Sequence, residues 1–305
     1  MSVDLGTAQE SAVRRLIARF SWPMLLLLCV MATAYGFAIE HPVVVFNLTY
    51  LTLAIVLFYL ERTMPFERTW LENDGQTFAN IAHTLTSKGL VQGLVTFSGV
   101  IGITAYITPM QGEGYGIWPR EWPLFIQVIM TLVIAEFGLY WAHRIAHEWP
   151  VLWKFHAIHH SVTRLWIVNT GRFHFIDSVF SILLGISLPL ALGAPLEAIT
   201  WLSAITAYIG MLTHCNVDMR FGVLSWVFNT PGLHRWHHSK KISEGNKNYG
   251  ENLVIWDQVF RTWINPDRRP PANIGIMEKM PAGFIAQLAW PFKQIRSQIK
   301  RKDNS

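Results

Sequence analysis

Histidine is the residue type in this sequence that points most directly to chemistry. The chain has 305 residues and twelve histidines, and ten of the twelve lie between positions 143 and 238. An even distribution would place only about four in that segment. Eight of the ten form three tight clusters: His143 and His147; His156, His159 and His160; and His234, His237 and His238.

The spacing within each cluster is that of one helix face. Residues three or four positions apart on a helix are neighbours, so each cluster directs its imidazoles toward one point. Imidazole is a ligand for Zn, Cu, Fe and Ni. Because one tetrahedral ion takes four ligands, eight imidazoles predict two metal ions. A solvated or packed polar patch is the alternative, but the repeated H-x-x-H-H pattern favours a metal site.

Four further histidines stand alone. His174 and His214 lie at the two ends of an almost uncharged segment, where the chain returns to the level of the clusters. We expect both to join the metal ligands. His41 is expected at the opposite face of the membrane and His83 in an earlier loop, so both are assigned structural roles.

The elements that must position these histidines are apolar. Hydrophobic residues make up 51% of the chain and charged residues only 15%, with a mean hydropathy of +0.27. Soluble domains carry about 25% charged residues, and a membrane-spanning helix needs about 20 mainly apolar residues. The sequence therefore predicts an integral membrane protein with six crossings. Four crossings occupy residues 22–39, 43–60, 90–110 and 123–142, and a hairpin of two more occupies residues 178–213.

A cleaved signal peptide is the alternative for the first apolar run, because Ala32-Thr33-Ala34 resembles a cleavage site. Loop charge predicts the orientation of the helices. Basic residues precede the first run, follow the second and surround the histidine clusters, whereas the opposite loops contain only Arg120. Lys and Arg are enriched on the cytoplasmic side. We therefore expect both termini and the histidines in the cytoplasm, in a bacterial inner membrane.

The histidine pattern H-x3-H, H-x2-H-H and again H-x2-H-H after a membrane hairpin resembles the fatty acid hydroxylase / sterol desaturase superfamily. The resemblance includes the segments Glu136-Phe-x2-Tyr140-Trp141-x-His143-Arg144 and Asn248-Tyr249-Gly250-x2-Leu253-x2-Trp256-Asp257-x2-Phe260. It implies an all-α integral membrane protein with four to six transmembrane helices and a cytoplasmic His-rich cap. It also implies a histidine-ligated, non-haem dimetal site that uses O2, with iron as the working metal.

On this basis the chain divides into three parts. Residues 1–120 form an N-terminal transmembrane region, and residues 121–268 form a fatty acid hydroxylase-like domain with the histidine clusters. Residues 269–305 form a basic, amphipathic tail. Such a tail suits a helix that lies in the membrane interface or one that packs on the cap.

Polar residues near the clusters are candidates for supporting roles. Glu136 lies seven residues before the first cluster, and a carboxylate inside an apolar run is costly unless it is paired. We therefore take Glu136 as a candidate catalytic residue, together with Asn248. Glu136, Asp177 and Asp257 are expected to accept the second ring N–H of ligating imidazoles. Many members of the superfamily carry Asp at the position of Glu136.

The residue types and the resemblance together predict a membrane-bound monooxygenase that hydroxylates a lipid, with a fatty-acyl, ornithine-lipid or sterol-like substrate. Desaturation is the alternative within the superfamily, because both reactions begin with the same hydrogen abstraction. A His-rich metal-ion transporter is an alternative from another class, but its ligands would lie near the middle of the membrane on broken helices. A zinc hydrolase would normally keep carboxylate ligands and a base nearby.

Electrons for such a reaction must come from a separate protein. The two cysteines, Cys29 and Cys215, are too few for a cysteine-ligated iron–sulfur cluster. The G-x-G-x-G at residues 112–116 lacks the strand and helix of a dinucleotide site. We therefore expect a ferredoxin, a rubredoxin or a cytochrome b5-like donor. The net charge of +5 is assigned to membrane anchoring rather than nucleic acid, and the 14 tryptophans to aromatic belts at the membrane interface.

Overall fold

The computed structural model describes residues 11–90, 93 and 116–303, and these residues form helices, loops and three isolated β-bridges. Four of the helices are long and apolar enough to cross a membrane: α1 (Ala12–Ala38), α2 (Pro42–Thr63), α6 (Leu124–Glu148) and α9 (Leu196–His214). A shorter apolar helix, α8 (Phe175–Ala191), precedes α9. The prediction of an all-α protein with four to six membrane helices is confirmed. The predicted crossing at 90–110 lies almost entirely outside the described residues.

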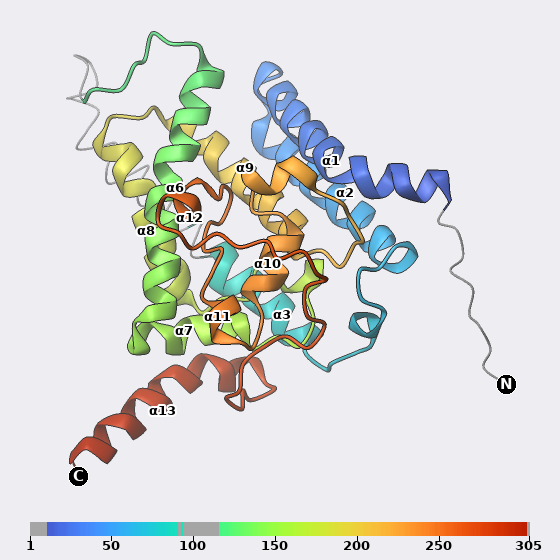
Figure 1. The fold of residues 1–305 in the computed structure, drawn as a ribbon. Coiled ribbons are helices and arrows are strands. Elements are labelled where there is room, and N and C mark those ends of the chain that lie inside the picture. The colour runs from blue at the N-terminus through green and yellow to red at the C-terminus, as the bar shows by residue number, and fades with distance from the viewer. Residues whose placement is uncertain (1–10, 91–92, 94–115, 304–305) are drawn as a thin grey trace, which may run out of the picture.

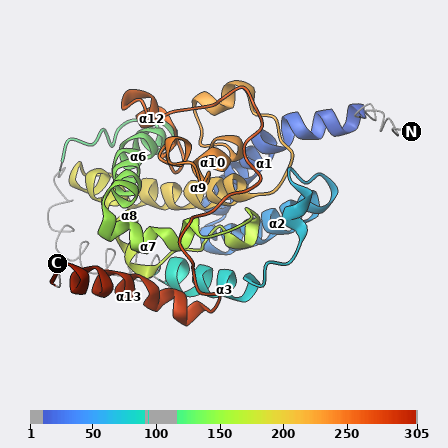
Figure 2. The same cartoon turned by 60° about the horizontal axis from the view of Figure 1, so that its bottom comes forward.

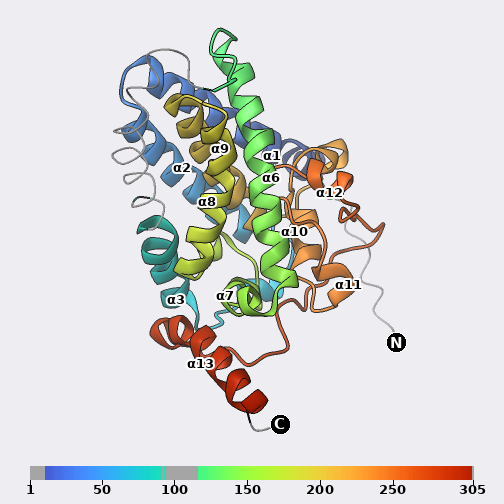
Figure 3. The same cartoon turned by 90° about the vertical axis from the view of Figure 1, so that its left-hand side faces the viewer.

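The long helices form a bundle in which α9 contacts α1, α2 and α6 (Figures 1 and 3). α1 packs along α2, and α6 packs along α8. Tyr208 and Leu212 of α9 are fully buried, and the Tyr208 hydroxyl lies 2.9 Å from that of Thr33 in α1. The outer faces of α1 and α2 instead expose large apolar side chains, among them Leu27 and Ile55. These faces suit contact with lipid.

Short helices and loops cover one end and one side of the bundle, and we call this region the cap (Figure 3). Two of its helices begin with proline, which suits a first helical turn because its missing N–H would have no partner there. The cap comprises η1 (Arg68–Leu71), α3 (Thr77–Ala82), η2 (His83–Leu90), α7 (Pro150–His160), η4 (Ile167–Asn169), η5 (Gly222–Trp226), α10 (Pro231–His237), α11 (Ile242–Gly245) and α12 (Ile255–Val259).

The C-terminal helix α13 (Phe284–Asp303) begins on the cap and then extends away from it (Figure 1), and its first turns lie beside α3 (Figure 2). Gln287 and Trp290, near its start, are buried, and Gln287 Oε1 lies 3.0 Å from His83 Nε2. Phe292 and Ile299, further along, are exposed. The first turns of the tail helix therefore pack on the cap, and its later turns present apolar side chains outward.

Two glycines set the close approach of α6 and α8. A Cβ atom on Gly138 of α6 would lie 2.0 Å from the backbone oxygen of Leu184 in α8. A Cβ atom on Gly185 of α8 would lie 2.6 Å from the side chain of Leu139. Small residues permit this kind of backbone contact between membrane helices. The contact holds the first turn of α8, which contains Asp177, against the bundle end that carries the histidines.

We expect Gly138→Ala to lower the free energy of unfolding by about 1–3 kcal/mol, because the added methyl group must push α6 and α8 apart. The measurement is thermal unfolding of the detergent-purified protein. Gly283→Ala is the matched control, since nothing lies within 4 Å of a Cβ atom at that position. Equal melting temperatures for the two variants would contradict the close helix contact.

Candidate metal centre

Nine histidine side chains converge where α6, α7, α9 and α10 meet, and they form two groups. Within each group, one ring nitrogen from every histidine lies within 4.8 Å of the others. We call the groups site 1 and site 2. Site 1 contains His143, His147, His156, His160 and His237, and site 2 contains His159, His214, His234 and His238.

The two sites adjoin each other because neighbouring residues contribute to different sites. His159 belongs to site 2 and His160 to site 1, while His237 belongs to site 1 and His238 to site 2. Successive residues on a helix point about 100° apart, so each H-x-x-H-H segment reaches both sites. The rings of His160 and His238 stack with their centroids 4.4 Å apart.

Ring nitrogens within each site have the spacing of ligands on one ion. In site 1, the Nε2 atoms of His147 and His160 lie 3.0 Å apart. In site 2, the Nε2 atom of His234 lies 3.1 Å from that of His214 and 3.0 Å from that of His238. Two imidazole nitrogens bound at right angles to one ion, at about 2.1 Å each, would lie about 3.0 Å apart. Both sites therefore match the geometry of shared coordination.

The second ring nitrogen of six histidines faces an acceptor outside the sites. Nδ1 of His156 lies 2.9 Å from the carboxylate of Asp177, as expected for that aspartate. An acceptor at Nδ1 holds the proton there and leaves the lone pair of Nε2 for a metal. The other five acceptors are the backbone oxygens of Tyr249 (His143, 2.7 Å), Lys247 (His237, 2.8 Å), Gly210 (His214, 2.8 Å) and Arg172 (His159, 3.3 Å), and Asn246 Oδ1 (His147, 3.2 Å).

Three of these acceptors belong to the loop at residues 246–252, and Glu136 holds that loop. The buried Glu136 carboxylate accepts the backbone N–H groups of Glu251 at 2.5 Å and Asn252 at 3.0 Å. We expected Glu136 to accept an imidazole N–H directly. Its hydrogen bonds place it instead as a support for the loop that carries the acceptors.

Asn248 and Asp257 fix the same loop. Asp257 accepts the backbone N–H groups of Tyr249 and Gly250, both at 2.8 Å. Asn248 has a φ of 55°, in the left-handed region that asparagine tolerates better than most residues. Its side-chain amide donates to the backbone oxygen of Ile264 at 2.9 Å. The hydrogen bonds of Asn248 therefore give it a role in shaping the loop.

Arg172 supports the centre in a way that the sequence analysis did not identify. Its backbone oxygen faces His159, and its buried guanidinium donates to the backbone oxygen of Ile158 at 3.0 Å and to Asn80 Oδ1 at 2.7 Å. Burial lowers the pKa of Arg172 to about 10, which still leaves the side chain charged at neutral pH. In the sequence this arginine signals only membrane orientation, because its partners lie between 11 and 96 residues away and follow no local pattern.

Burial also keeps the imidazoles neutral. Desolvation, reinforced by the neighbouring rings, lowers the pKa values of His159, His160, His237 and His238 well below the usual value for histidine. A neutral imidazole retains a lone pair, whereas the protonated ring has two donors and no acceptor. At neutral pH the two sites therefore present ligands rather than positive charges.

The residues present fit two metal ions. Nε2 of His156 and of His237 is buried and has no hydrogen-bond partner among the described residues. An unsatisfied buried polar atom costs about 1–3 kcal/mol, and a bond to a metal removes that cost. An all-imidazole donor set suits Fe, Zn and Cu. The sites can thus hold metal ions, one in each.

The four histidines outside the three sequence clusters differ in their positions relative to the sites. His214, expected as a ligand, lies in site 2. His174, also expected as a ligand, lies outside both sites: its Nδ1 accepts the N–H of Ile176, and its Nε2 lies 3.3 Å from the backbone oxygen of Leu288. His41 directly precedes the first turn of α2 and belongs to neither site. His83 Nδ1 lies 2.9 Å from the backbone oxygen of Phe173.

The region that carries these histidines matches a known family. Residues 128–262 match the fatty acid hydroxylase family. Over 281 residues the chain is 50% identical to the ornithine lipid hydroxylase OlsE of Rhizobium tropici, which covers 91% of this chain and 85% of that protein. No solved structure matches the chain.

More distant relatives share the same region. The chain is 29% identical over 276 residues to the fatty acid hydroxylase vlmA of Lecanicillium, covering 83% of this chain and 70% of that protein. It is 28% identical over 221 residues to the alkylglycerol monooxygenase of Xenopus tropicalis, covering 70% of this chain and 48% of that protein. Both histidine sites lie inside the matched region, and half of the residues are shared with one relative over most of both chains. The chain therefore belongs to the fatty acid hydroxylase family.

Proposed function

We propose that this protein hydroxylates an ornithine lipid, using O2 and a pair of iron ions held at sites 1 and 2. The observation that carries the proposal is the burial of nine imidazoles in two adjoining sites, within a chain that is 50% identical to an ornithine lipid hydroxylase. Fatty-acyl and sterol-like lipids are the competing substrate classes, and desaturation is the competing reaction.

Hydroxylation inserts one oxygen atom of O2 into a C–H bond and releases the other as water, which takes two electrons and two protons per turnover. An imidazole-bound iron pair supplies the reductive activation of O2. The chain contributes the geometry: the acceptors at Nδ1 hold six rings in fixed orientations, and Asp177 holds His156 by a carboxylate. Burial of the sites excludes bulk water from the reacting atoms.

We propose further that the sites face the cytoplasm of a bacterial cell. The start of α1 lies beside the segment that follows His214, because Arg14 contacts Asp218 at 3.5 Å and the N–H of Arg220 donates to the backbone oxygen of Ala18. The basic residues at the start of α1 are therefore on the histidine side. Since basic residues favour the cytoplasmic side, this placement supports a cytoplasmic electron donor such as a ferredoxin, a rubredoxin or a cytochrome b5-like protein.

Purified protein should contain two metal ions per chain, because the imidazoles divide into two sites. Elemental analysis of the metal-reconstituted protein measures this ratio, and His41→Ala should retain it. Zinc can replace iron during purification, since nitrogen sites generally bind Zn²⁺ more tightly than Fe²⁺. A ratio of one or zero in the reconstituted protein would argue against the dimetal assignment.

Loss of one ligand from either site should abolish turnover. We expect His237→Ala in site 1 and His159→Ala in site 2 to lower hydroxylation at least about 100-fold, since even residues that only orient ligands contribute 10–100-fold. His41→Ala is the control and should stay active. Mass spectrometry of cellular lipids reads the result: hydroxylation adds one oxygen atom, whereas desaturation removes two hydrogens. An active His237→Ala enzyme would show that site 1 is not needed.

The orientation of the cap can be measured by cysteine labelling. Lys241 is an exposed cap residue and Glu40 lies in the exposed α1–α2 turn, while the native Cys29 and Cys215 are buried. Lys241→Cys should react with an impermeant maleimide only from the cytoplasmic side, and Glu40→Cys only from the periplasmic side. Reversed labelling would refute the orientation.

The need for an electron donor can be tested with the purified parent enzyme. It should be inactive with NADPH alone and active once a donor protein and its reductase are added. Turnover with NADPH alone would refute the need for a donor.

A further inference from the structure

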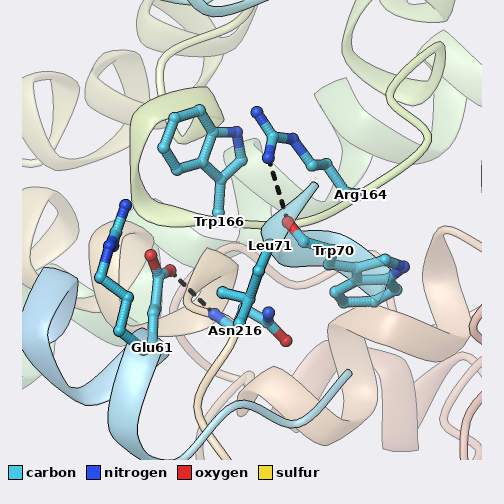
Figure 4. A pocket seen from close by; sticks show the side chains of 7 residues that line it. Glu61, Trp70, Leu71, Arg164, Trp166 and Asn216 are labelled. Atoms are coloured by element: carbon cyan, nitrogen blue, oxygen red, sulfur yellow. Dashed lines mark hydrogen bonds between the residues drawn. The ribbon is translucent and has the colours of Figure 1, made fainter. Parts of the chain in front are cut away.

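A small pocket lies beside site 2, where the end of α2 meets the cap (Figure 4). Its lining comes from three segments that are far apart in the sequence. Glu61 lies in the last turn of α2, Arg164 lies four residues after His160, and Asn216 lies two residues after His214. The pocket has a volume of about 50 Å³, which is room for a few water-sized groups. Glu61, Arg62, Trp70, Leu71, Arg164, Trp166 and Asn216 line it.

Two N–H donors at this pocket have no acceptor among the described residues: Nε of Arg164 and Nε1 of Trp166. Both side chains are at least nine-tenths buried. The Arg164 guanidinium lies 4.2 Å from the centroid of the Trp166 ring. Its other nitrogens donate to the backbone oxygen of Trp70 at 3.1 Å and to Asp74 at 3.1 Å, so the guanidinium is held in place. Two fixed, unsatisfied donors form a site for an anionic oxygen group.

The same pocket also offers a negative charge. Glu61 is 1% exposed, and its Oε1 accepts the backbone N–H groups of Ile167 and Asn216, both at 2.9 Å. The two donated N–H groups and the nearby Arg62 and Arg164 favour the carboxylate form, whereas burial of the side chain favours the neutral acid. Its other oxygen, Oε2, accepts no hydrogen bond among the described residues. A cation can therefore be paired here.

The combination of charges selects the ligand. Arg62 also lines the pocket, and Asp74 forms an ion pair with Arg164 at 3.1 Å, so two positive and two negative side chains lie in or next to it. A simple anion or a simple cation would therefore meet a like charge as well as an opposite one. A molecule that carries both a carboxylate and an ammonium group can satisfy both Arg164 and Glu61. We propose that this pocket binds a zwitterionic amino-acid group, with its carboxylate at Arg164 and Trp166 and its ammonium at Glu61. Resting on the proposed function, we assign this group to the headgroup of an ornithine lipid.

The position of the pocket favours a lipid over a free amino acid. It lies at the end of α2, and the preceding turns of that helix expose Ile55, Phe58 and Tyr59. An apolar helix face that leads to a polar pocket matches a lipid whose chains lie along the face and whose headgroup lies at the interface. An ornithine linked through its α-amine keeps both a carboxylate and a δ-ammonium group. Headgroup binding here would anchor the lipid beside His214 of site 2.

The test measures equilibrium binding of a tritiated short-chain ornithine lipid to the full-length protein in phosphatidylcholine nanodiscs. Trp166→Phe removes one N–H donor and keeps an aromatic ring against Arg164. Glu61→Gln removes the charge and keeps an oxygen that accepts the two backbone N–H groups. Trp226→Phe is the control, because Trp226 stacks on Trp263 and does not line the pocket. The lipid is used intact, as its carboxylate methyl ester and as its δ-N-acetyl derivative.

We expect Trp166→Phe to weaken binding of the intact lipid about tenfold, as for loss of a hydrogen bond to a charged group. The same substitution should leave binding of the methyl ester unchanged. Glu61→Gln should weaken the intact lipid by a similar factor and leave the δ-N-acetyl derivative unchanged. Trp226→Phe should bind all three lipids like the parent protein. Equal effects of a substitution on the intact and the blocked lipid would overturn the assignment of that contact.

Two further measurements distinguish a wrong assignment of the pocket from a wrong proposed function. Nα-acetylornithine that competes as strongly as the lipid would show that the pocket takes free amino acids and would overturn the lipid assignment. Binding is measured without turnover. If the protein binds the intact lipid selectively but forms no hydroxylated lipid, the proposed function is wrong and the pocket assignment stands. If the parent protein hydroxylates the lipid and the pocket variants bind every lipid as the parent does, the pocket assignment is wrong and the proposed function stands.

Discussion

The structure depends on holding nine imidazole rings close together in the neutral form. Charged rings at these distances would repel one another, and solvated rings would rotate freely. Burial removes the charge, and an acceptor on the outer nitrogen of six rings removes the rotation. Most of these acceptors are backbone oxygens, so the path of the backbone around the sites determines which ring nitrogen points inward.

The cap provides that backbone path, and buried polar side chains hold the cap. Arg235 donates to the backbone oxygens of Cys215 and Val217 at 2.9 and 3.0 Å, directly after the histidine that ends α9. Arg172 and Arg164 hold other cap carbonyls in the same way. Buried charges of this kind are expensive unless they are hydrogen-bonded. The partners available here are carbonyl groups that short helices and loops leave unpaired.

The sequence predicts the membrane helices and most of the metal centre, because both depend on local patterns. Apolar runs of helical length identify α1, α2, α6 and α9, and short histidine spacings identify eight of the nine imidazoles that the structure brings together. His214 could be predicted from its place at the end of an apolar run. The division of the histidines into two sites could not be predicted, since it requires the relative rotation of α7 and α10.

The roles of Glu136 and His174 could not be predicted from the sequence, because they depend on long-range hydrogen bonds. Glu136 contacts a loop 115 residues away, and nothing local distinguishes a carboxylate that meets an imidazole from one that meets a backbone N–H. His174 caps α8 and contacts α13, and a single histidine gives no sign of which of these roles it has. In the sequence Trp166 looks like any other interface aromatic, and only the structure shows that it lies against Arg164 in the lining of a pocket.

α7 and α10 each supply ligands to both sites, and this arrangement affects how the metal centre assembles. Each short helix is a rigid body that supplies ligands to both sites, through His159 and His160 and through His237 with its neighbour His238. An ion that binds in one site fixes the rotation and position of both helices, and so arranges the ligands of the other site before its ion arrives. The entropy of ordering the helices is then lost once rather than twice. We therefore expect metal loading to be cooperative, with little singly loaded protein at half-saturation.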